Sequence, residues 1–501
     1  MHTQSAREKP VRLRAGTIGK LPEVVSVPSY DRSGIETGIV HFGVGGFHRA
    51  HQAMYVDRLL ELGEAREWGI CGVGVLPSDR RMRDVMHEQD CLYTLSVTHP
   101  DGTWQTRVIG SIVEYLYAPD DPEAVLGKLA DEHTRIVSLT ITEGGYNFSA
   151  ATGEFDAHNP AIVADLAPGA VPATAFGLIV EALARRRERG LAPFTIMSCD
   201  NIEGNGHVAR STFTAFARLR DPDLADWIDR TGAFPDSMVD RITPATTAET
   251  AAEVTHRSSV DDRWPVVTEP FTQWVLEDDF PLGRPAYEKA GVQPVDAVAP
   301  YELMKLRLLN ASHQAMCYFG YLSGYRLVHE VAQDPVFVRF LLRYMDTEAT
   351  PTLRPVPGVD LGEYKRTLIE RFANPAIRDT LARLCADSSD RIPKWLLPVV
   401  RSQLRTGGDI SCAAAVVASW ARYAEGVDEQ GEPIDIVDPL RDDLVALARA
   451  QRTEPTAFLS DRTVFGDLVE EPRFVEAYRA ALRSLHQHGA RATVEVLAEW
   501  P

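Results

Sequence analysis

The stretch GIVHFGVGGFHRAHQ, residues 38–52, predicts a strand, a tight glycine turn and the beginning of a helix. Its apolar start is typical of a buried strand, and apolar residues at helical spacing follow at Ala53, Met54, Val56, Leu59 and Leu60. In this order the glycines let the backbone turn and let a phosphate approach helix N–H groups, which is the context of a dinucleotide-binding site. His48 stands at the third glycine position of the common GxGxxG pattern, so an ordinary turn between strand and helix is the alternative.

The first acidic residue after the second predicted strand bears on the choice of dinucleotide. That strand is GICGVGV, residues 69–75, and the acid is Asp79. In such folds an acid at this place binds the ribose hydroxyls of the adenosine, which favours NAD over NADP. Arg80 and Arg81 follow directly and would suit the 2′-phosphate of NADP, so some use of NADP stays open. The alternative for Asp79 is a solvated acid in a loop.

The pattern of the remaining segments predicts two domains of different texture. A chain of 501 residues exceeds the roughly 250 to 300 residues at which a single core stops growing. Residues 92–97, 135–142 and 194–198 are further predicted strands, and the helical pattern of 173–189 between them indicates βα units and a largely parallel sheet. From about residue 300 onward, long segments carry apolar residues at helical spacing. We place the boundary near residue 295, which gives an α/β domain of residues 1–295 and a mostly α-helical domain of residues 296–501.

Composition and charge exclude several kinds of protein. The formal net charge of −19 repels phosphate backbones and anionic bilayers, so neither nucleic acid nor a membrane surface is an expected partner. The first thirty residues hold no apolar core of a signal peptide, and no apolar run approaches the roughly 20 residues that cross a bilayer. Six cysteines are spread singly, which is typical of reduced thiols. We therefore expect a cytoplasmic protein.

The segment of residues 301–318 (YELMKLRLLNASHQAMCY) is apolar at most helical positions but contains Lys305, Asn310 and His313. On a helix turning by about 100° per residue these lie near 0°, 140° and 80°, so they share one arc. Burial disfavours the charged form of a lysine and moves its pKa toward neutrality, which makes Lys305 a candidate general base for a secondary alcohol. The alternatives are a surface lysine and a hydrogen-bonded core histidine.

Another polar cluster, Cys199-Asp200-Asn201, directly follows the predicted strand of residues 194–198. Ligands of open α/β sheets bind at the carboxyl ends of strands, so the amide of Asn201 is placed to donate a hydrogen bond to a reacting oxygen. The alternative is a turn residue that caps the helix expected after Gly206.

Several blocks along nearly the whole chain carry a resemblance to a known family. They are GVGGFHRAHQ (43–52), TITEGGY (140–146), MSCDN (197–201), NGH (205–207), FPDSMVDRITP (234–244), EPFTQWVLED (269–278) and KLRLLNASH (305–313). Together they closely resemble the polyol-specific long-chain dehydrogenases of the mannitol dehydrogenase family. The resemblance implies a Rossmann-like N-terminal domain, a mostly α-helical C-terminal domain, catalysis in the cleft between them and no metal. It also implies NAD-dependent hydride transfer between a sugar alcohol, in the first place mannitol, and its ketose. Members of this family favour the expectation of a monomer.

The resemblance also implies roles for individual residues. Lys305 matches the catalytic general base, Asn201 and Asn310 match the amides that hold the substrate oxygen, His313 matches a residue that orients the substrate, and Glu302 matches a proton relay to solvent. Substrate contacts are expected from Asp240, Arg383 and Arg391, the last of which stands where the mannitol enzymes carry lysine. Ser78 stands where close relatives carry a second acid beside Asp79, which weakens the exclusion of NADP. The expected cofactor-binding residues are Val40, Phe42, Gly43, Val44, Gly45, Gly46, Phe47, His48, Asp79, Thr142 and Glu143.

Rival functions remain open at this point. Reductases of the sugar acids fructuronate and tagaturonate resemble many of the same blocks, and a substrate carboxylate would suit Arg383 and Arg391. Arabinitol, sorbitol or another polyol is a further alternative to mannitol. A zinc-dependent polyol dehydrogenase needs clustered Cys, His and acidic ligands. The pair His48-x-x-His51 is a candidate, but it lies in the glycine turn and has no cysteine nearby. A non-catalytic nucleotide-binding protein would need the glycine turn but not Lys305, the two asparagines and His313.

Overall fold

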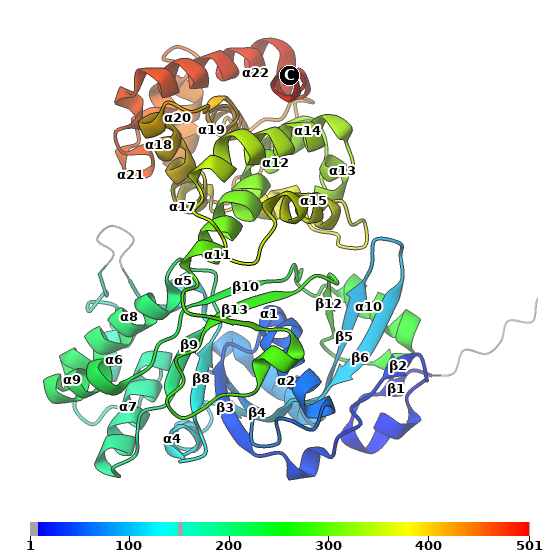
Figure 1. Cartoon of the computed structure of the whole chain (residues 1–501), viewed down its shortest axis with the longest axis vertical. Coiled ribbons are helices and arrows are strands. Elements are labelled where there is room, and N and C mark those ends of the chain that lie inside the picture. The colour runs from blue at the N-terminus through cyan, green and yellow to red at the C-terminus, as the bar shows by residue number, and fades with distance from the viewer. Residues whose placement is uncertain (1–8, 149–153, 500–501) are drawn as a thin grey trace, which may run out of the picture. The chain divides into compact units, whose positions relative to one another are not determined.

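The computed structural model describes residues 9–148 and 154–499, so the first eight residues of the polar leader lie outside the description. The chain divides into two compact units, Met1–Ala299 and Pro300–Pro501. All strands of the described residues belong to the first unit, whereas the second consists of helices and their connections (Figure 1). The predicted class, a Rossmann-like α/β domain followed by a mostly α-helical domain, is confirmed.

The central sheet of the first unit has five parallel strands in the order β7-β4-β3-β8-β9. Numbered by appearance within this sheet, the order is 3-2-1-4-5, which is the order of a Rossmann fold. The strands are β3 (Thr37–Phe42), β4 (Gly69–Gly74), β7 (Ile112–Tyr117), β8 (Ile136–Leu139) and β9 (Thr195–Ser198). The predicted strands at 38–42, 69–75, 135–142 and 194–198 correspond to β3, β4, β8 and β9, the third being shorter than expected.

Helices cover both faces of this sheet, which explains why its strands are apolar on both sides. On one face Ile39 of β3 belongs to the same cluster of buried side chains as Met54 of α2 (Gln52–Glu61). On the other face its neighbour Val40 clusters with side chains of several further helices. They include α4 (Pro122–Ala130), α7 (Ala175–Glu188), α8 (Asn205–Arg220) and α9 (Pro222–Thr231).

Two smaller sheets of the first unit contain antiparallel strand pairs, whereas the sequence pattern predicts a largely parallel sheet. The predicted strand at 92–97 is β5 (Tyr93–Thr98), which pairs antiparallel with β6 (Trp104–Ile109) in a separate sheet. Its other neighbour is β12 (Val266–Thr268), and β2 (Val25–Ser26) lies beside β6. A third sheet joins β10 (Ser237–Asp240), β13 (Gln273–Glu277) and β14 (Gln293–Val295).

The second unit opens with a helix that changes its pitch. After α11 (Ala299–Met304), residues Lys305–Asn310 form a π-helical segment, and α12 (Ala311–Leu322) continues from it. This corrects the prediction of a regular α-helix at 100° per residue, because the i→i+5 hydrogen bonding of a π-turn widens the helix. Such π-segments occur frequently at functional sites, and this one begins at Lys305 and ends at Asn310.

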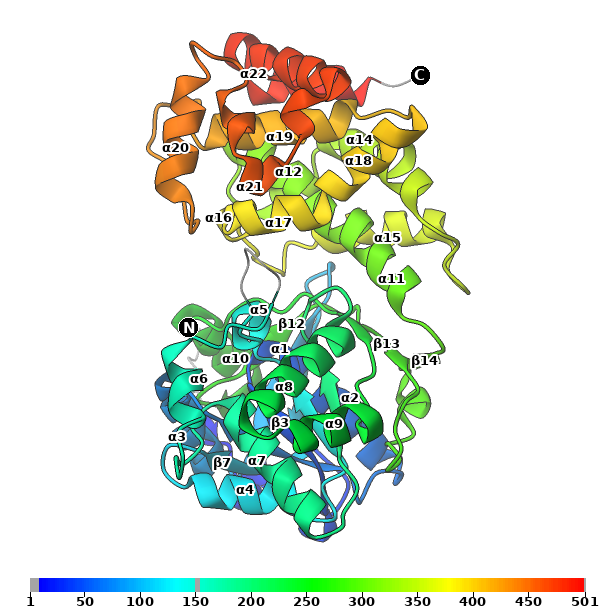
Figure 2. The same cartoon turned by 90° about the vertical axis from the view of Figure 1, so that its left-hand side faces the viewer.

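Several helices of the second unit pack against α12. They include α14 (Pro335–Arg343), α16 (Leu381–Cys385), α17 (Ser388–Trp395) and α19 (Ser411–Tyr423). The unit also contains α15 (Leu361–Phe372) and α20 (Arg441–Ala450), of which α20 contacts α19. The long α22 (Pro472–Ala498) runs along α19 (Figure 2). Its backbone is kinked at Gly489, where φ is 83°. Among the helices described, none is both long and apolar enough to span a membrane.

Candidate active site

The predicted cofactor site lies where the strand order of the central sheet reverses, between β3 and β8. Gly43 follows β3 with φ of +90°, and a Cβ atom on it would lie 2.1 Å from the carbonyl oxygen of Thr140, which follows β8. Thr140 Oγ1 donates a hydrogen bond to the Gly43 carbonyl at 2.6 Å. Only glycine fits this position, and the two strand ends are braced against each other at the place where dinucleotides bind in this fold.

His48 does not present a charged ring to a phosphate. It lies in the short helix α1 (Gly46–Ala50), is 1 % exposed, and stacks on His41 of β3 with ring centroids 3.4 Å apart. Burial lowers the pKa of His41 to about 3 and lowers the pKa of His48 well below its usual range. The flat neutral ring lets α1 pack on β3, which is the part that the third glycine plays elsewhere.

The other residues predicted to bind the cofactor differ in what they expose. Val40 and Phe42 are fully buried in the sheet and Val44 is nearly so; they help to place the glycine turn. In contrast, Gly45 is exposed, and Gly46 and Phe47 are partly exposed. The N–H of Gly43 donates to the carbonyl of Val73 at 3.4 Å, and that of Gly45 donates to the carbonyl of Gly43 at 2.7 Å. The exposed backbone that a phosphate can approach therefore lies at the start of α1, at Gly46 and Phe47.

Asp79 closes the turn after β4. Its Oδ2 accepts the N–H groups of Val75 and Leu76, each at 2.9 Å. The carboxylate is thereby held near the carboxyl end of the second strand, where a ribose-binding acid is expected. Of the two arginines that follow, Arg81 stacks on the ring of Trp264 at 4.3 Å, and Arg80 is exposed at the start of α3 (Arg80–Glu88).

A buried carboxylate that the sequence analysis did not assign joins two of the predicted segments. Asp200, 7 % exposed, accepts the backbone N–H of Ile141 at 3.0 Å and that of Thr142 at 2.8 Å. The hydroxyl of Tyr146 donates to the same carboxylate at 2.8 Å. Thr142 has φ of +62°, an unfavourable conformation for a β-branched residue, and these bonds stabilise it. Burial raises the pKa of Asp200 to about 6, although the three hydrogen bonds act in the opposite direction.

The segment that follows Asp200 is fixed through Asn205. The Asn205 side chain donates to the carbonyl of Asp200 at 2.9 Å and to that of Ser237 at 2.7 Å. Asn201 is exposed on the segment so anchored, and Thr142 and Glu143 are exposed on the turn that Asp200 holds. The structure thus brings the predicted blocks at 140–146 and 197–201 together.

Asp240 ends β10 and is largely buried. The next residue, Arg241, donates through Nη1 to the carbonyl of Ala50, the last residue of α1, at 2.6 Å, and through Nη2 to the carbonyl of Glu269 at 3.0 Å. Burial lowers the pKa of Arg241 to about 10. The blocks at 234–244 and 269–278 are therefore tied by Arg241 to the helix that follows the glycine turn.

The predicted proton-transfer residues lie in the second unit on one continuous helical stretch. Lys305 is 8 % exposed, and Glu302, Asn310 and His313 are buried to a similar degree. The His313 ring lies 4.7 Å from the ring of Phe372 on α15. Within the described residues Asn310 Oδ1 is buried without a hydrogen-bond partner, an arrangement that costs about 1–3 kcal/mol unless a ligand supplies one. This helical stretch thus brings together the buried amine of Lys305, the amide of Asn310, whose oxygen has no hydrogen-bond partner among the described residues, and the imidazole of His313.

The two predicted substrate arginines are bound within their own unit. Arg383 on α16 pairs with the carboxylate of Asp379, with 2.6 Å between Nε and Oδ1. Arg391 on α17 donates through Nη1 to the carbonyl of Arg383 at 3.1 Å and to that of Leu384 at 3.3 Å. Sequence reasoning missed Asp379, although its i,i+4 spacing to Arg383 within the same segment is a signal for such a pair.

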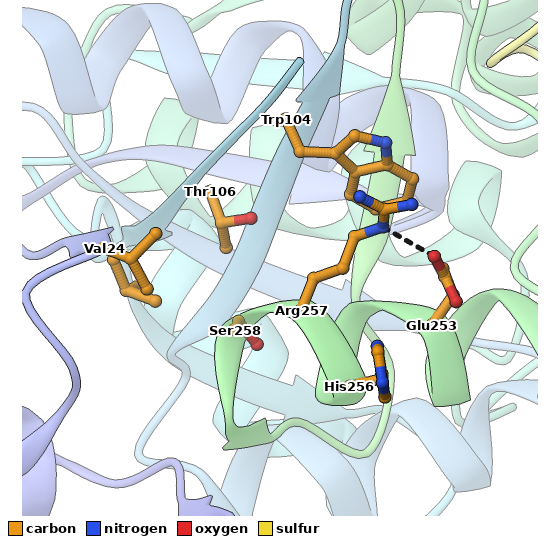
Figure 3. A pocket seen from close by; sticks show the side chains of 8 residues that line it. Val24, Trp104, Thr106, Glu253, His256, Arg257 and Ser258 are labelled. Carbon is orange, nitrogen blue, oxygen red and sulfur yellow. Dashed lines mark hydrogen bonds and ion pairs between the residues drawn. The ribbon is translucent and has the colours of Figure 1, made fainter. Parts of the chain in front are cut away.

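A pocket of about 370 Å³ lies elsewhere in the first unit (Figure 3). Arg257 of α10 (Ala248–Ser258) borders it, pairs with Glu253 at 2.6 Å and lies 4.7 Å from the ring centre of Trp104. None of the predicted site residues lines this pocket. Within residues 9–148 and 154–499, no group of three or more His, Cys, Asp and Glu side chains is arranged to hold a metal ion.

A Rossmann domain with a braced glycine turn, joined in sequence to a helical domain with a buried lysine, asparagine and histidine, defines a two-domain dehydrogenase. The chain belongs to the mannitol dehydrogenase family. It matches the Mannitol dehydrogenase Rossmann domain over residues 37–289 and the Mannitol dehydrogenase C-terminal domain over residues 297–486.

Individual relatives are similar over almost the full chain. The mannitol 2-dehydrogenase of Phaeosphaeria nodorum is 47 % identical over 488 residues, which cover 97 % of this chain and 85 % of the relative. The structure of Pseudomonas fluorescens mannitol 2-dehydrogenase in a ternary complex with NAD and D-mannitol has a TM-score of 0.90 and 46 % identity, covering 98 % of this chain and 100 % of that one. A D-sorbitol dehydrogenase in substrate-free form has a TM-score of 0.89 and 41 % identity, covering 97 % and 100 %.

Proposed function

We propose that this protein oxidises D-mannitol to D-fructose with NAD and catalyses the reverse reduction. Its class rests on the family and the relatives: the chain is an NAD-dependent polyol dehydrogenase. The observation that carries the choice of mannitol is the full-length similarity to the Pseudomonas fluorescens enzyme, whose complex contains NAD and D-mannitol. The family match and that complex favour NAD as the cofactor.

The N-terminal unit supplies the cofactor-binding residues in this proposal. The glycine turn of Gly43, Gly45 and Gly46 would hold the pyrophosphate near the start of α1, and the carboxylate of Asp79 would accept hydrogen bonds from the ribose hydroxyls. The close packing of Gly43 on Thr140 supports this assignment, because the turn is shaped for backbone contact. Thr142 and Glu143, held by Asp200, border the same end of the sheet. Bound NAD supplies the hydride acceptor.

The C-terminal unit supplies the proton transfer. Lys305, neutral in the active form, removes the proton of the C2 hydroxyl while the C2 hydrogen leaves as hydride to NAD, so that the carbinol becomes a ketone. The amides of Asn201 and Asn310 donate to the oxygen as negative charge develops, an effect worth roughly 3–4 kcal/mol per donor in comparable sites. Glu302 passes the proton from Lys305 to solvent. His313, Asp240 and Arg383 orient the remaining hydroxyls.

The buried Lys305, Asn310 and His313 on one helical stretch support catalysis over mere nucleotide binding, because a binding protein has no use for a proton-transfer set. Sorbitol is the strongest alternative polyol, given the 41 % identity to a D-sorbitol dehydrogenase. A sugar-acid reductase is disfavoured by the internal pairing of Arg383 with Asp379. The cytoplasmic location and the monomeric state expected from the sequence belong to this proposal, and light scattering of the purified protein tests the second.

The direct test is NADH formation by the purified protein with mannitol, sorbitol and arabinitol, repeated with NADP. We expect the highest kcat/KM with mannitol and NAD, and fructose as the product. Lys305→Ala should abolish turnover and leave NADH binding, measured by fluorescence titration, close to wild type. Lys394→Ala, which removes a lysine paired with Asp390 on the surface of the same unit, is the control and should keep its activity. Near wild-type turnover of Lys305→Ala at neutral and alkaline pH would refute the general-base assignment.

A further inference from the structure

The backbone around Arg383 is fixed to the helix that carries His313. Helix α16 packs against α12, and Gln314, which follows His313, donates through Nε2 to the carbonyl of Leu384 at 3.2 Å. The same carbonyl accepts Arg391 Nη1 at 3.3 Å. The position of Arg383 is therefore coupled to that of the proposed proton-transfer residues within one unit.

The guanidinium of Arg383 is already bound by a carboxylate of its own chain. Nε donates to Oδ1 of Asp379 at 2.6 Å and Nη2 donates to Oδ2. This two-point contact is the arrangement in which an arginine recognises a carboxylate most strongly. A substrate carboxylate would have to displace Asp379 or accept a weaker contact at another edge of the guanidinium.

Asp379 itself has little freedom to give way. It is 5 % exposed, its Oδ1 also accepts the N–H of Thr380 at 2.9 Å, and its carbonyl accepts the N–H of Val328 at 3.0 Å. The Arg383 side chain is 53 % exposed, so its remaining N–H groups are open to hydroxyl groups from solvent or substrate. The Arg383–Asp379 ion pair as a whole has no net charge, so it does not attract an anionic ligand.

Arg391 does not replace the missing positive charge. Its Nη1 is used by two backbone carbonyls, and its Nη2 lies 3.7 Å from the carboxylate of Asp387. We read Arg391 as a positioning residue that holds the backbone of Arg383 and Leu384. Both arginines that could have selected a sugar acid are thus neutralised by acids four residues before them.

We propose that Asp379 is a specificity-determining residue: it occupies the carboxylate-binding edge of Arg383, so that the site accepts neutral polyols and ketoses and rejects sugars that carry a carboxylate. The inference rests on the proposed function, in which Arg383 contacts the substrate. It goes beyond that function by assigning the rejection of anionic substrates to one side chain outside the substrate-binding set.

The test uses Asp379→Asn, which removes the charge and keeps an oxygen that accepts the N–H groups of Thr380 and Arg383. NADH oxidation is measured with fructose and, separately, with fructuronate. We expect the ratio of kcat/KM for fructuronate to that for fructose to rise roughly tenfold or more over wild type, the effect of one charge-assisted hydrogen bond. A misfolded variant would lower both values and would not raise their ratio.

Asp390→Asn is the matched control. Asp390 pairs with Lys394 at 2.7 Å in the same unit, and its substitution changes the net charge by the same amount. The ratio should stay at the wild-type value in this variant. No rise in Asp379→Asn, or an equal rise in both variants, overturns the inference.

A salt series on the wild-type enzyme tests the inference without any substitution. Salt screens attraction between exposed charges, so a KM for fructuronate that depends on a free Arg383 would increase steeply with ionic strength. We expect a weak dependence in wild type and a steep one in Asp379→Asn; a steep dependence in wild type contradicts the inference. If the wild type prefers fructuronate to fructose, the proposed function fails as well, whereas a preference for fructose with an unchanged variant ratio refutes the inference alone.

Discussion

At the scale of single residues, Asp200 links cofactor binding to pH. Its ionised carboxylate accepts the N–H groups of Ile141 and Thr142 and the hydroxyl of Tyr146. Because burial raises the pKa of this group to about 6, protonation below that pH places a hydrogen on one of the accepting oxygens. The strained turn at Thr142, which is proposed to border the cofactor, then loses part of its support.

We therefore expect the dissociation constant of NADH in wild type to increase as the pH falls through about 6. Asp200→Asn should bind NADH roughly tenfold more weakly at pH 8, as expected for one lost charge-assisted hydrogen bond, and should show no such pH dependence. Fluorescence titration of NADH between pH 5 and pH 8 measures both. The same acid step in wild type and variant would show that Asp200 is not its source.

Although Asp200→Asn should weaken NADH binding, it should not lower the free energy of unfolding at pH 8. A carboxyl whose folded-state pKa lies above its usual value contributes stability at low pH that is lost as the pH rises toward about 6. At pH 8 Asp200→Asn should therefore unfold at a urea concentration equal to or above that of wild type, although it binds NADH less well. A large loss of stability would make Asp200 a structural residue only.

The sequence predicted the residues that carry recognisable chemistry but not the partners that hold them. Lys305, Asn310 and His313 stand out because they interrupt an apolar helix. The contact between Asp200 and Thr142 joins residues 58 positions apart, and no local pattern marks such a pair. The histidine at the third glycine position is explained by its stacking on His41 of β3, the strand that leads into the turn, and the turn pattern alone does not show this ring contact.

At the scale of the secondary-structure elements, the glycine turn between β3 and α1 depends on close contact between two backbones. A methyl group on Gly43 would lie 2.1 Å from the carbonyl oxygen of Thr140, and φ at this residue is +90°. Gly63, which follows α2, has φ of +77° but no heavy atom within 4 Å of an added Cβ. Gly43 and Gly63 therefore share a backbone conformation that is unfavourable for other residues, but only Gly43 lies in close contact with another segment of backbone.

We expect Gly63→Ala to cost about 1 kcal/mol of unfolding free energy and to leave NADH binding unchanged, since only backbone strain is added. Gly43→Ala should cost clearly more, about 3 kcal/mol, and weaken NADH binding at least tenfold, because the Thr140 carbonyl must move. Urea unfolding and fluorescence titration of both variants measure the difference. Equal effects of the two substitutions would mean that the contact with Thr140 has no role in cofactor binding.

Four strands of the central sheet, β3, β4, β8 and β9, were predicted, because buried parallel strands are continuous apolar runs between turn residues. The edge strand β7 was missed. The π-helical segment Lys305–Asn310 was not predicted either, since its apolar pattern differs little from that of an α-helix. The antiparallel pairing of β5 was also missed, because pairing partners are chosen by the tertiary fold and not by the strand's own residues.

At the scale of the whole molecule, a buried ionic cluster secures the last helix of the C-terminal unit. Glu425 follows α19 and accepts hydrogen bonds from His486 of α22 at 2.7 Å and from Arg452 at 2.8 Å. Burial favours the neutral acid, but these hydrogen bonds outweigh it and hold the pKa of Glu425 at about 2. The stability that the ionised form contributes is thus present above pH 4.5 and is lost as the pH falls toward about 2.

Glu425→Gln should accordingly lower the free energy of unfolding by about 3 kcal/mol at pH 6, and the difference from wild type should shrink as the pH falls to 2. The midpoint of urea unfolding across this pH range measures the effect. Asp467→Asn, which removes an exposed carboxylate paired with Arg401 at 2.5 Å, should have little effect at either pH. A difference between Glu425→Gln and wild type that stays constant with pH would contradict the role given to this cluster.

The central claim is that hydride passes from C2 of mannitol to NAD. The most direct measurement uses D-mannitol deuterated at both C2 and C5, because the twofold symmetry of the molecule makes these two carbons equivalent. The labelled mannitol is incubated with NAD and the purified protein, and both products are analysed by mass spectrometry. We predict one deuterium in the reduced cofactor and one, at C5, in the fructose formed. Unlabelled reduced cofactor with both deuterium atoms kept in the sugar product, or no reaction with mannitol at all, would contradict the claim.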